Sequence, residues 1–178
     1  IVHAGLDAVL KATNVVDGVG GDTLNAQAKG AALSRFESSR QRFYSSLLVA
    51  MKMPTLLKAI EEELARGNVA VVQLVSTSEA ILERRLAELS PEERATLDLD
   101  LSPREVLVRY LSDAFPTRQM EVYKDNSGET RSRPARDADG NPVLCQEAVR
   151  ARDGLIERLC AMPPVPTALD ELIRHFGT

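Results

Sequence analysis

The stretch Asn68–Arg85, NVAVVQLVSTSEAILERR, joins an apolar run to a helix start, and the rest of the chain is interpreted around it. Val69–Val75 is apolar at nearly every position, a pattern typical of a strand covered on both faces in a parallel α/β sheet. Ser76 and Glu79 have capping-box spacing, so a helix should begin close to Ser76. Such a junction presents free backbone N–H groups and a helix dipole to an anion. The run 76–78 is therefore a candidate phosphate site, with plain helix capping as the competing interpretation.

Composition restricts the class of protein. The chain has 178 residues, is 44% hydrophobic and 27% charged, and carries a net charge of −4. These values predict an ordinary globular protein of one sizeable domain or two small ones, and they argue against a polycation that coats nucleic acid. Cys145 and Cys160 lack paired spacing, and no apolar run is long enough to cross a membrane. We therefore expect a cytoplasmic protein with reduced thiols and no membrane partner. The chain begins with Ile, and we expect both ends to continue into a longer protein.

Helical patterns account for most of the chain. Leu6, Val9 and Leu10 share one face of the first predicted helix. Pro54 is expected to end the second helix and open the third, because proline cannot continue a helix but suits its first turn. The periodicity and capping signals predict helices at 1–13, 24–50, 54–65, 76–89, from 90, 102–115, 146–162 and from 167.

Residues 118–134 predict a β-hairpin. Arg118–Lys124 alternates in strand fashion, Asp125–Gly128 is a turn, and Glu129–Pro134 is a second extended segment. The region is the most basic part of the chain, with Arg118, Lys124, Arg131, Arg133 and Arg136. Arg131 and Arg133 are the candidate phosphate contacts here; the alternative is that they are solvated charges that protect a sheet edge.

The common catalytic and metal-binding motifs are absent from the sequence. There is no G-x-x-x-x-G-K-[ST] loop, no G-x-G-x-x-G after a strand and no G-x-S-x-G. His3 and His175 lack ligand spacing to cysteine or carboxylate. We expect no catalytic residue, no cofactor and no metal site within these 178 residues.

Three stretches together resemble a known family. They are RFESSRQRFY (35–44), NVAVVQLVSTSEA (68–80) and LCAMPPVPTALDELIRHFG (159–177). In order and spacing they resemble the strawberry-notch family of superfamily 2 helicase-like proteins, in its bacterial and phage branch. The resemblance covers most of the chain from about Arg35 onward.

The resemblance implies a piece of an ATP-driven nucleic-acid motor, at the start of its second RecA-like lobe. Ser76 and Thr77 match the family's Ser-Thr pair at a strand end that holds the nucleic-acid backbone. Ser78 stands where the family commonly has Gly, which weakens the case for close backbone approach there. The family's ATP and Mg elements would lie before Ile1 and after Thr178, so the fragment alone should be inactive. Bacterial relatives often occur in mobile-element proteins described as methylase/helicase, and the methylase signature is absent here.

Two functions therefore compete. One is a helicase fragment that contacts nucleic acid, DNA rather than RNA, alongside the remainder of the helicase chain. The other is a helical adaptor that binds proteins and neither nucleic acid nor nucleotide, which the net charge favours. The expected fold is α+β and mainly helical, a partial RecA-like second lobe with one buried strand. Four segments are expected: N-terminal helices at 1–67, a strand-helix core at 68–115, a hairpin insertion at 116–145 and C-terminal helices at 146–178.

Overall fold

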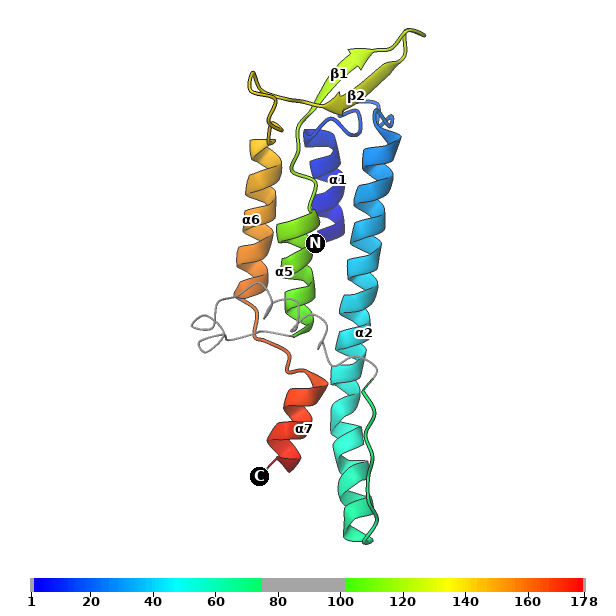
Figure 1. Ribbon diagram of the computed structural model, residues 1–178, viewed down its shortest axis with the longest axis vertical. Helices are drawn as coiled ribbons and strands as arrows, with labels where there is room; N and C mark the ends of the chain where they lie inside the picture. Colours follow the sequence, from blue (N-terminus) through cyan, green and yellow to red (C-terminus); the bar gives the residue numbers. More distant parts are fainter. Residues whose placement is uncertain (1, 75–101, 178) are drawn as a thin grey trace. The chain divides into compact units, whose positions relative to one another are not determined.

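The computed structural model describes residues 2–74 and 102–177 (Figure 1). The fold is α+β and mainly helical, as predicted. Its elements are α1 Val2–Ala12, α2 Ala26–Ala65, α5 Pro103–Ala114, β1 Met120–Lys124, β2 Thr130–Pro134, α6 Gln146–Cys160 and α7 Ala168–Phe176. The chain divides into two compact units. Unit 1 is Ile1–Gln41 with Leu107–Pro163, and unit 2 is Arg42–Val106 with Pro164–Thr178.

The core of unit 1 is assembled from helix faces that the periodicity predicts. Leu6, Val9 and Leu10 of α1 are all buried, which confirms the predicted face of that helix. Aromatic rings add to this core, since Tyr110 packs against Phe36 at a centroid distance of 5.9 Å and against Phe115 at 6.1 Å. Each fully buried apolar side chain of this size stabilises the fold by about 1.5–3 kcal/mol.

Asn14 ends α1 and turns the chain toward α2. Its φ of 59° lies in the left-handed region, which asparagine tolerates better than most residues. The backbone N–H groups of Val15 and Val16 both donate to the carbonyl of Leu10, at 3.0 Å each, and so satisfy the end of the helix. This closure leads the chain directly beneath the hairpin.

Unit 2 contains the C-terminal part of α2 together with α7. Thr167 and Asp170 form the predicted capping box at the start of α7. His175 Nε2 lies 2.6 Å from Glu61 Oε1, so α7 contacts α2 within this unit. The buried apolar side chains that the structure describes in unit 2 are Met53, Ile60 and Pro103.

The predicted helix break at Pro54 is wrong, because α2 runs without interruption from Ala26 to Ala65. A proline inside a helix removes one backbone donor and costs about 3 kcal/mol relative to alanine. Met53 and Ile60 are seven positions apart and therefore lie on one face of α2, where both are buried. Their shared burial favours a continuous helix over a break.

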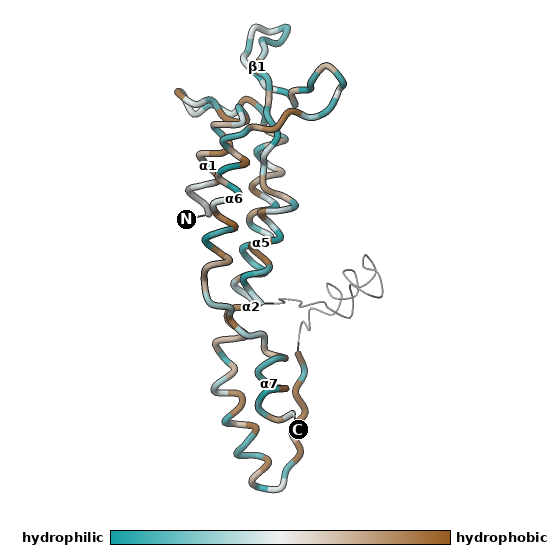
Figure 2. The backbone as a smooth tube through the Cα atoms, turned by 90° about the vertical axis from the view of Figure 1, so that its left-hand side faces the viewer, coloured by the Kyte–Doolittle hydropathy of each residue, from teal (hydrophilic) through white to brown (hydrophobic). Residues whose placement is uncertain are grey.

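The predicted buried strand at Val69–Val75 is also wrong over the residues described. Val69–Leu74 forms no strand, and Val69 and Val71 are 89% and 91% exposed. The residues are strongly β-forming, but a strand exists only where a neighbour satisfies its backbone groups. No hydrogen bond joins this segment to another residue within 2–74 or 102–177. Figure 2 shows it as an apolar tube segment after α2. Val75, the phosphate-site run 76–78 and the helices predicted at 76–89 and from 90 lie outside the described residues.

The hairpin is confirmed, with β1 and β2 paired antiparallel from Met120 opposite Pro134 to Lys124 opposite Thr130. This two-stranded hairpin is the one sheet among the residues that the structure describes, so the RecA-like lobe implied by the resemblance stays a prediction. None of the described helices is long and apolar enough to cross a membrane.

Candidate nucleic-acid interface at the hairpin

The hairpin is fixed to the end of unit 1 by its own backbone. Met120 and Ser132, on opposite strands, are 9% and 5% exposed and form the inner side of the hairpin. The hydrogen bonds that join them to the chain between α1 and α2 are Met120 N to Thr13 O (2.9 Å), Asn14 Nδ2 to Met120 O (3.1 Å), Ser132 N to Leu24 O (3.0 Å) and Asn25 Nδ2 to Ser132 O (2.9 Å). These hydrogen bonds anchor the hairpin to unit 1, and its outer side faces solvent.

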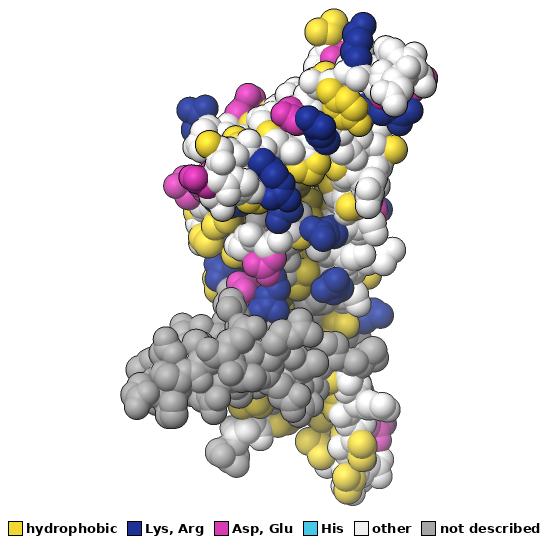
Figure 3. Space-filling view, turned by 45° about the horizontal axis from the view of Figure 1, so that its top comes forward, with side chains coloured by type: hydrophobic (Ala, Val, Ile, Leu, Met, Phe, Trp, Pro, Cys, Tyr) yellow, Lys and Arg dark blue, Asp and Glu magenta, His cyan; other side chains and the backbone are white. Residues whose placement is uncertain are grey.

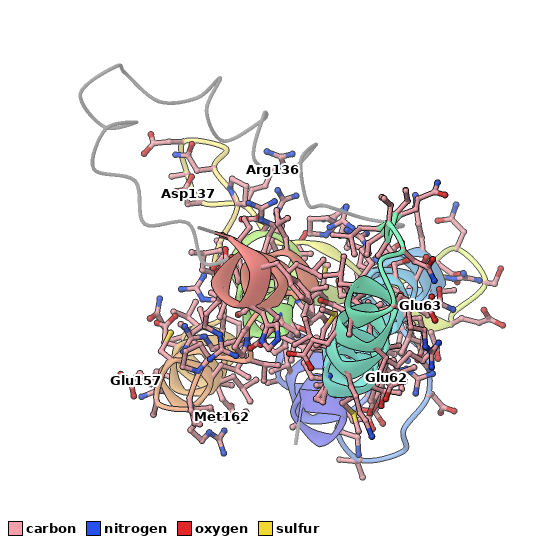
Figure 4. All side chains as sticks on the ribbon, turned by 90° about the horizontal axis from the view of Figure 1, so that it is seen from below. Glu62, Glu63, Arg136, Asp137, Glu157 and Met162 are labelled. Atoms are coloured by element: carbon pink, nitrogen blue, oxygen red, sulfur yellow. The ribbon has the colours of Figure 1, made fainter. Side chains whose placement is uncertain are left out.

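The loop between the hairpin and α6 adds further hydrogen bonds that anchor the hairpin. Gln119 N donates to Val143 O at 2.9 Å, and Ala135 N donates to Gln119 O at 2.9 Å. Arg136 and Asp137 project from this loop (Figure 4). Arg136 Nη1 donates to Gly140 O at 2.5 Å, so its guanidinium is bound to a carbonyl within its own loop.

Asp137 holds the tip of the same loop together. Its Oδ1 accepts the backbone N–H groups of Asn141 at 2.9 Å and Asp139 at 3.0 Å. The backbone hydrogen bond from Asn141 is the main reason why the pKa of Asp137 lies below its ordinary value. This carboxylate has a structural role in the turn.

On the solvent face of the hairpin, arginine side chains pair with carboxylates around one aromatic ring. In the strand register Tyr123 is opposite Arg131, and Glu121 is opposite Arg133. Arg133 Nε lies 2.5 Å from Glu121 Oε1, and its Cζ lies 5.2 Å from the centre of the Tyr123 ring. This is a cation–π distance.

Arg131 is held by two carboxylates. Its Nε lies 2.5 Å from Asp125 Oδ2, and its Nη2 lies 2.9 Å from Glu129 Oε2. The side-chain hydrogen bond from Arg131 is the largest cause of the lowered pKa of Asp125, and backbone N–H groups of Ser127 and Glu129 contribute. The same hydrogen bond raises the pKa of Arg131. Both members of the pair are thus stabilised in their charged forms.

The structure therefore brings Arg131 and Arg133 together on one face, where both are engaged with carboxylates. The cations of this region that have no carboxylate partner among the residues described are Arg118, Lys124 and Arg136. Residues 118–136 hold five cations and three carboxylates, a net charge of +2 in a chain of −4. Figure 3 shows Lys and Arg side chains over this end of unit 1.

Sequence reasoning did not single out Lys124, one of three cations of this region without a carboxylate partner among the described residues, or Tyr123, which is 37% exposed. The available signal is the antiparallel register, which begins with Met120 opposite Pro134 and therefore places Glu121 opposite Arg133. The other predicted contacts, Ser76, Thr77 and Ser78, lie outside the described residues. Within 2–74 and 102–177, no three histidine, cysteine or acidic side chains are grouped so that they could hold a metal ion.

Comparisons with known proteins give one partial similarity. No protein-family model matches the chain, and no solved structure matches it. The chain is 30% identical over 97 residues to protein strawberry notch homolog 2 of Mus musculus. The match covers 54% of this chain and 7% of the mouse protein. This partial similarity agrees with a helicase-like relationship, and the chain spans a small part of the length of the mouse protein.

Proposed function

We propose that this chain is a non-catalytic part of a helicase-like protein of the strawberry notch type, and that it contributes to the second lobe and to nucleic-acid contact. The observation that carries the proposal is the 30% identity over 97 residues to strawberry notch homolog 2. The three stretches at 35–44, 68–80 and 159–177 agree with it, because their order along the chain resembles that family. In this proposal ATP and Mg bind elsewhere in a bacterial, cytoplasmic parent protein, which in some relatives also carries a DNA methylase.

Two sites would contact the nucleic acid, with DNA preferred to RNA. Ser76, Thr77 and Ser78 would offer hydroxyl and backbone N–H donors to a phosphate. The hairpin would offer cations, although Arg131 and Arg133 must exchange a carboxylate for a phosphate to take part. Lys124 needs no such exchange.

The salt dependence of DNA binding tests which of these two sites contacts the phosphates. Cationic contacts release counterions, at a slope of about 0.9 per phosphate neutralised on duplex DNA, whereas neutral donors add little. Replacing Lys124 with Ala should flatten the salt dependence of binding to a labelled DNA oligonucleotide more than replacing Arg131 with Ala. Replacing Ser76 and Thr77 with Ala should weaken binding without changing the slope. Loss of the predicted cap could cost about 1 kcal/mol of stability, so folding is checked first.

Turnover provides an independent check. The purified chain should show no ATPase above background with or without DNA, because the phosphate-cradling loop is absent from its sequence. ATP hydrolysis that persists through further purification and is stimulated by DNA would contradict the proposal.

A helical protein adaptor is the second candidate, and one observation favours it. Tyr44, Leu48 and Met51 are spaced i, i+4, i+7 along α2, so they share one face, and they are 54%, 55% and 67% exposed. Exposed apolar stripes are typical of protein-binding helices. If no nucleic acid binds at low salt, the adaptor should replace the helicase proposal.

A further inference from the structure

Tyr123 and Arg133 form an exposed stack on the solvent face of the hairpin. The Tyr123 residue is 37% exposed, and the Arg133 side chain is 64% exposed although it lies 5.2 Å from the ring centre. Glu121 holds Arg133 over the ring through the 2.5 Å ion pair. An aromatic ring and a guanidinium plane, fixed side by side and open to solvent, are the two surfaces on which nucleic-acid bases stack.

The charges beside this stack distinguish between kinds of nucleic acid. A duplex presents phosphates to a flat surface, and its base faces are covered by neighbouring base pairs. Arg131 and Arg133 each already have a carboxylate partner, so phosphates gain little from them. An unpaired base, in contrast, can use the ring and the guanidinium plane without displacing any carboxylate.

Lys124 lies on the other side of the hairpin, because side chains alternate along β1 and Lys124 shares the inner side with Met120 and Ser132. The cations beside the stack are therefore Arg131 and Arg133, whose guanidinium groups already pair with carboxylates. We infer that the solvent face of the hairpin binds single-stranded nucleic acid, with one base stacked on Tyr123 and Arg133. This inference rests on the proposed function and names the substrate class of the hairpin site.

The test measures the affinity of the 178-residue chain for two probes by fluorescence anisotropy. One is a labelled oligothymidylate of about ten nucleotides, within the range of single-strand site sizes, and the other is the same strand annealed to oligoadenylate. We expect the single strand to bind at least about tenfold more tightly than the duplex. Tyr123→Ala should weaken single-strand binding about tenfold, since one stacking contact is lost, whereas Tyr123→Phe should retain it.

Two matched controls separate stacking from folding and from charge. Leu64→Ala removes an apolar side chain that is 47% exposed on α2 and should leave affinity unchanged. Arg133→Lys keeps the charge but removes the planar group, and we expect it to weaken single-strand binding several-fold. Arg131→Lys, on the same strand, should have a smaller effect because Arg131 is not the residue stacked on the ring.

The outcomes distinguish the inference from the function beneath it. If the chain binds both probes equally, or if Tyr123→Ala binds the single strand as tightly as the unmodified chain, the stacking site is overturned while nucleic-acid contact stands. If the unmodified chain binds neither probe at low salt, both the proposed function and this inference fail.

Discussion

Unit 1 and unit 2 differ in how far their apolar side chains are buried. In unit 1 a single cluster of fifteen buried residues joins α1, the N-terminal part of α2, α5, α6 and the base of the hairpin. Ten of the fifteen large hydrophobic residues that are exposed within the described chain belong to unit 2, which contributes the smaller share of described residues. Burial of apolar surface is the main stabilising contribution to folding, so we expect unit 1 to be the more stable unit and unit 2 to offer surface for contacts.

The largest effect is expected from the centre of the unit 1 core. Leu111 is 0% exposed, and Leu111→Ala should lower the free energy of unfolding by about 3–4 kcal/mol through lost burial and a residual cavity. Leu48→Ala makes the same chemical change in another helix, at a residue 55% exposed in unit 2, and should cost less than about 1 kcal/mol. Denaturant titration of both variants gives the two values. Similar losses would contradict the difference between the units.

A pair within unit 2 sharpens the comparison. Met53 is 2% exposed and Met51 is 67% exposed on the same helix. Met53→Ala should cost about 2 kcal/mol, and Met51→Ala should have almost no effect. Hydrogen exchange of the α2 amides detects this loss even where unit 2 opens separately from unit 1. If Met51→Ala is the more damaging change, the exposed stripe is covered in solution and the adaptor function gains support.

A smaller effect, of opposite sign, is expected from a polar group in the unit 1 core. Tyr110 is 3% exposed, and its hydroxyl makes no hydrogen bond with any described residue. Tyr110→Phe removes an unsatisfied buried group and should stabilise the protein by about 1 kcal/mol at neutral pH. Thermal unfolding would measure the gain, and a loss of stability would indicate that the hydroxyl has a partner in solution.

The same residue predicts a pH dependence. Burial raises the pKa of Tyr110 from 10.0 to about 12. Because the folded state keeps the proton longer than the unfolded state, the free energy of unfolding should fall as pH rises from 10 to 12. Tyr110→Phe should show a shallower fall over this interval, since the residue can no longer titrate.

The smallest effect concerns the hairpin. Arg131 is the main cause of the low pKa of Asp125, so Arg131→Ala should move the pKa of Asp125 up toward its ordinary value. Asp137 serves as the control, because its pKa is lowered chiefly by the backbone hydrogen bond from Asn141 and should stay where it is. Carboxyl titration by NMR compares both groups in one sample. In the unmodified chain, the stability linked to Asp125 is present above its unfolded pKa and is lost as pH falls through the folded value. An unchanged Asp125 would show that the ion pair is not formed in solution.

Local sequence determined the buried face of α1, the cap of α7 and the hairpin. The burial of Leu6, Val9 and Leu10 follows from their spacing, and Thr167 with Asp170 caps α7 as predicted. Such signals are readable because helix faces and caps depend on residues within four positions of one another.

Contacts between distant residues decided the rest. Val69–Leu74 has the composition of a buried strand, yet it is exposed, because a strand requires a neighbour that its own residues do not supply. Pro54 stays inside a helix because Met53 and Ile60 are buried on one face of α2. Arg131 and Arg133 look like free cations in the sequence, and only the pairing of β1 with β2 places Glu121 beside Arg133 and Arg133 over Tyr123. Whether a charge is paired and whether a side chain is exposed depend on the neighbours of the residue. The tertiary structure decides which residues become neighbours.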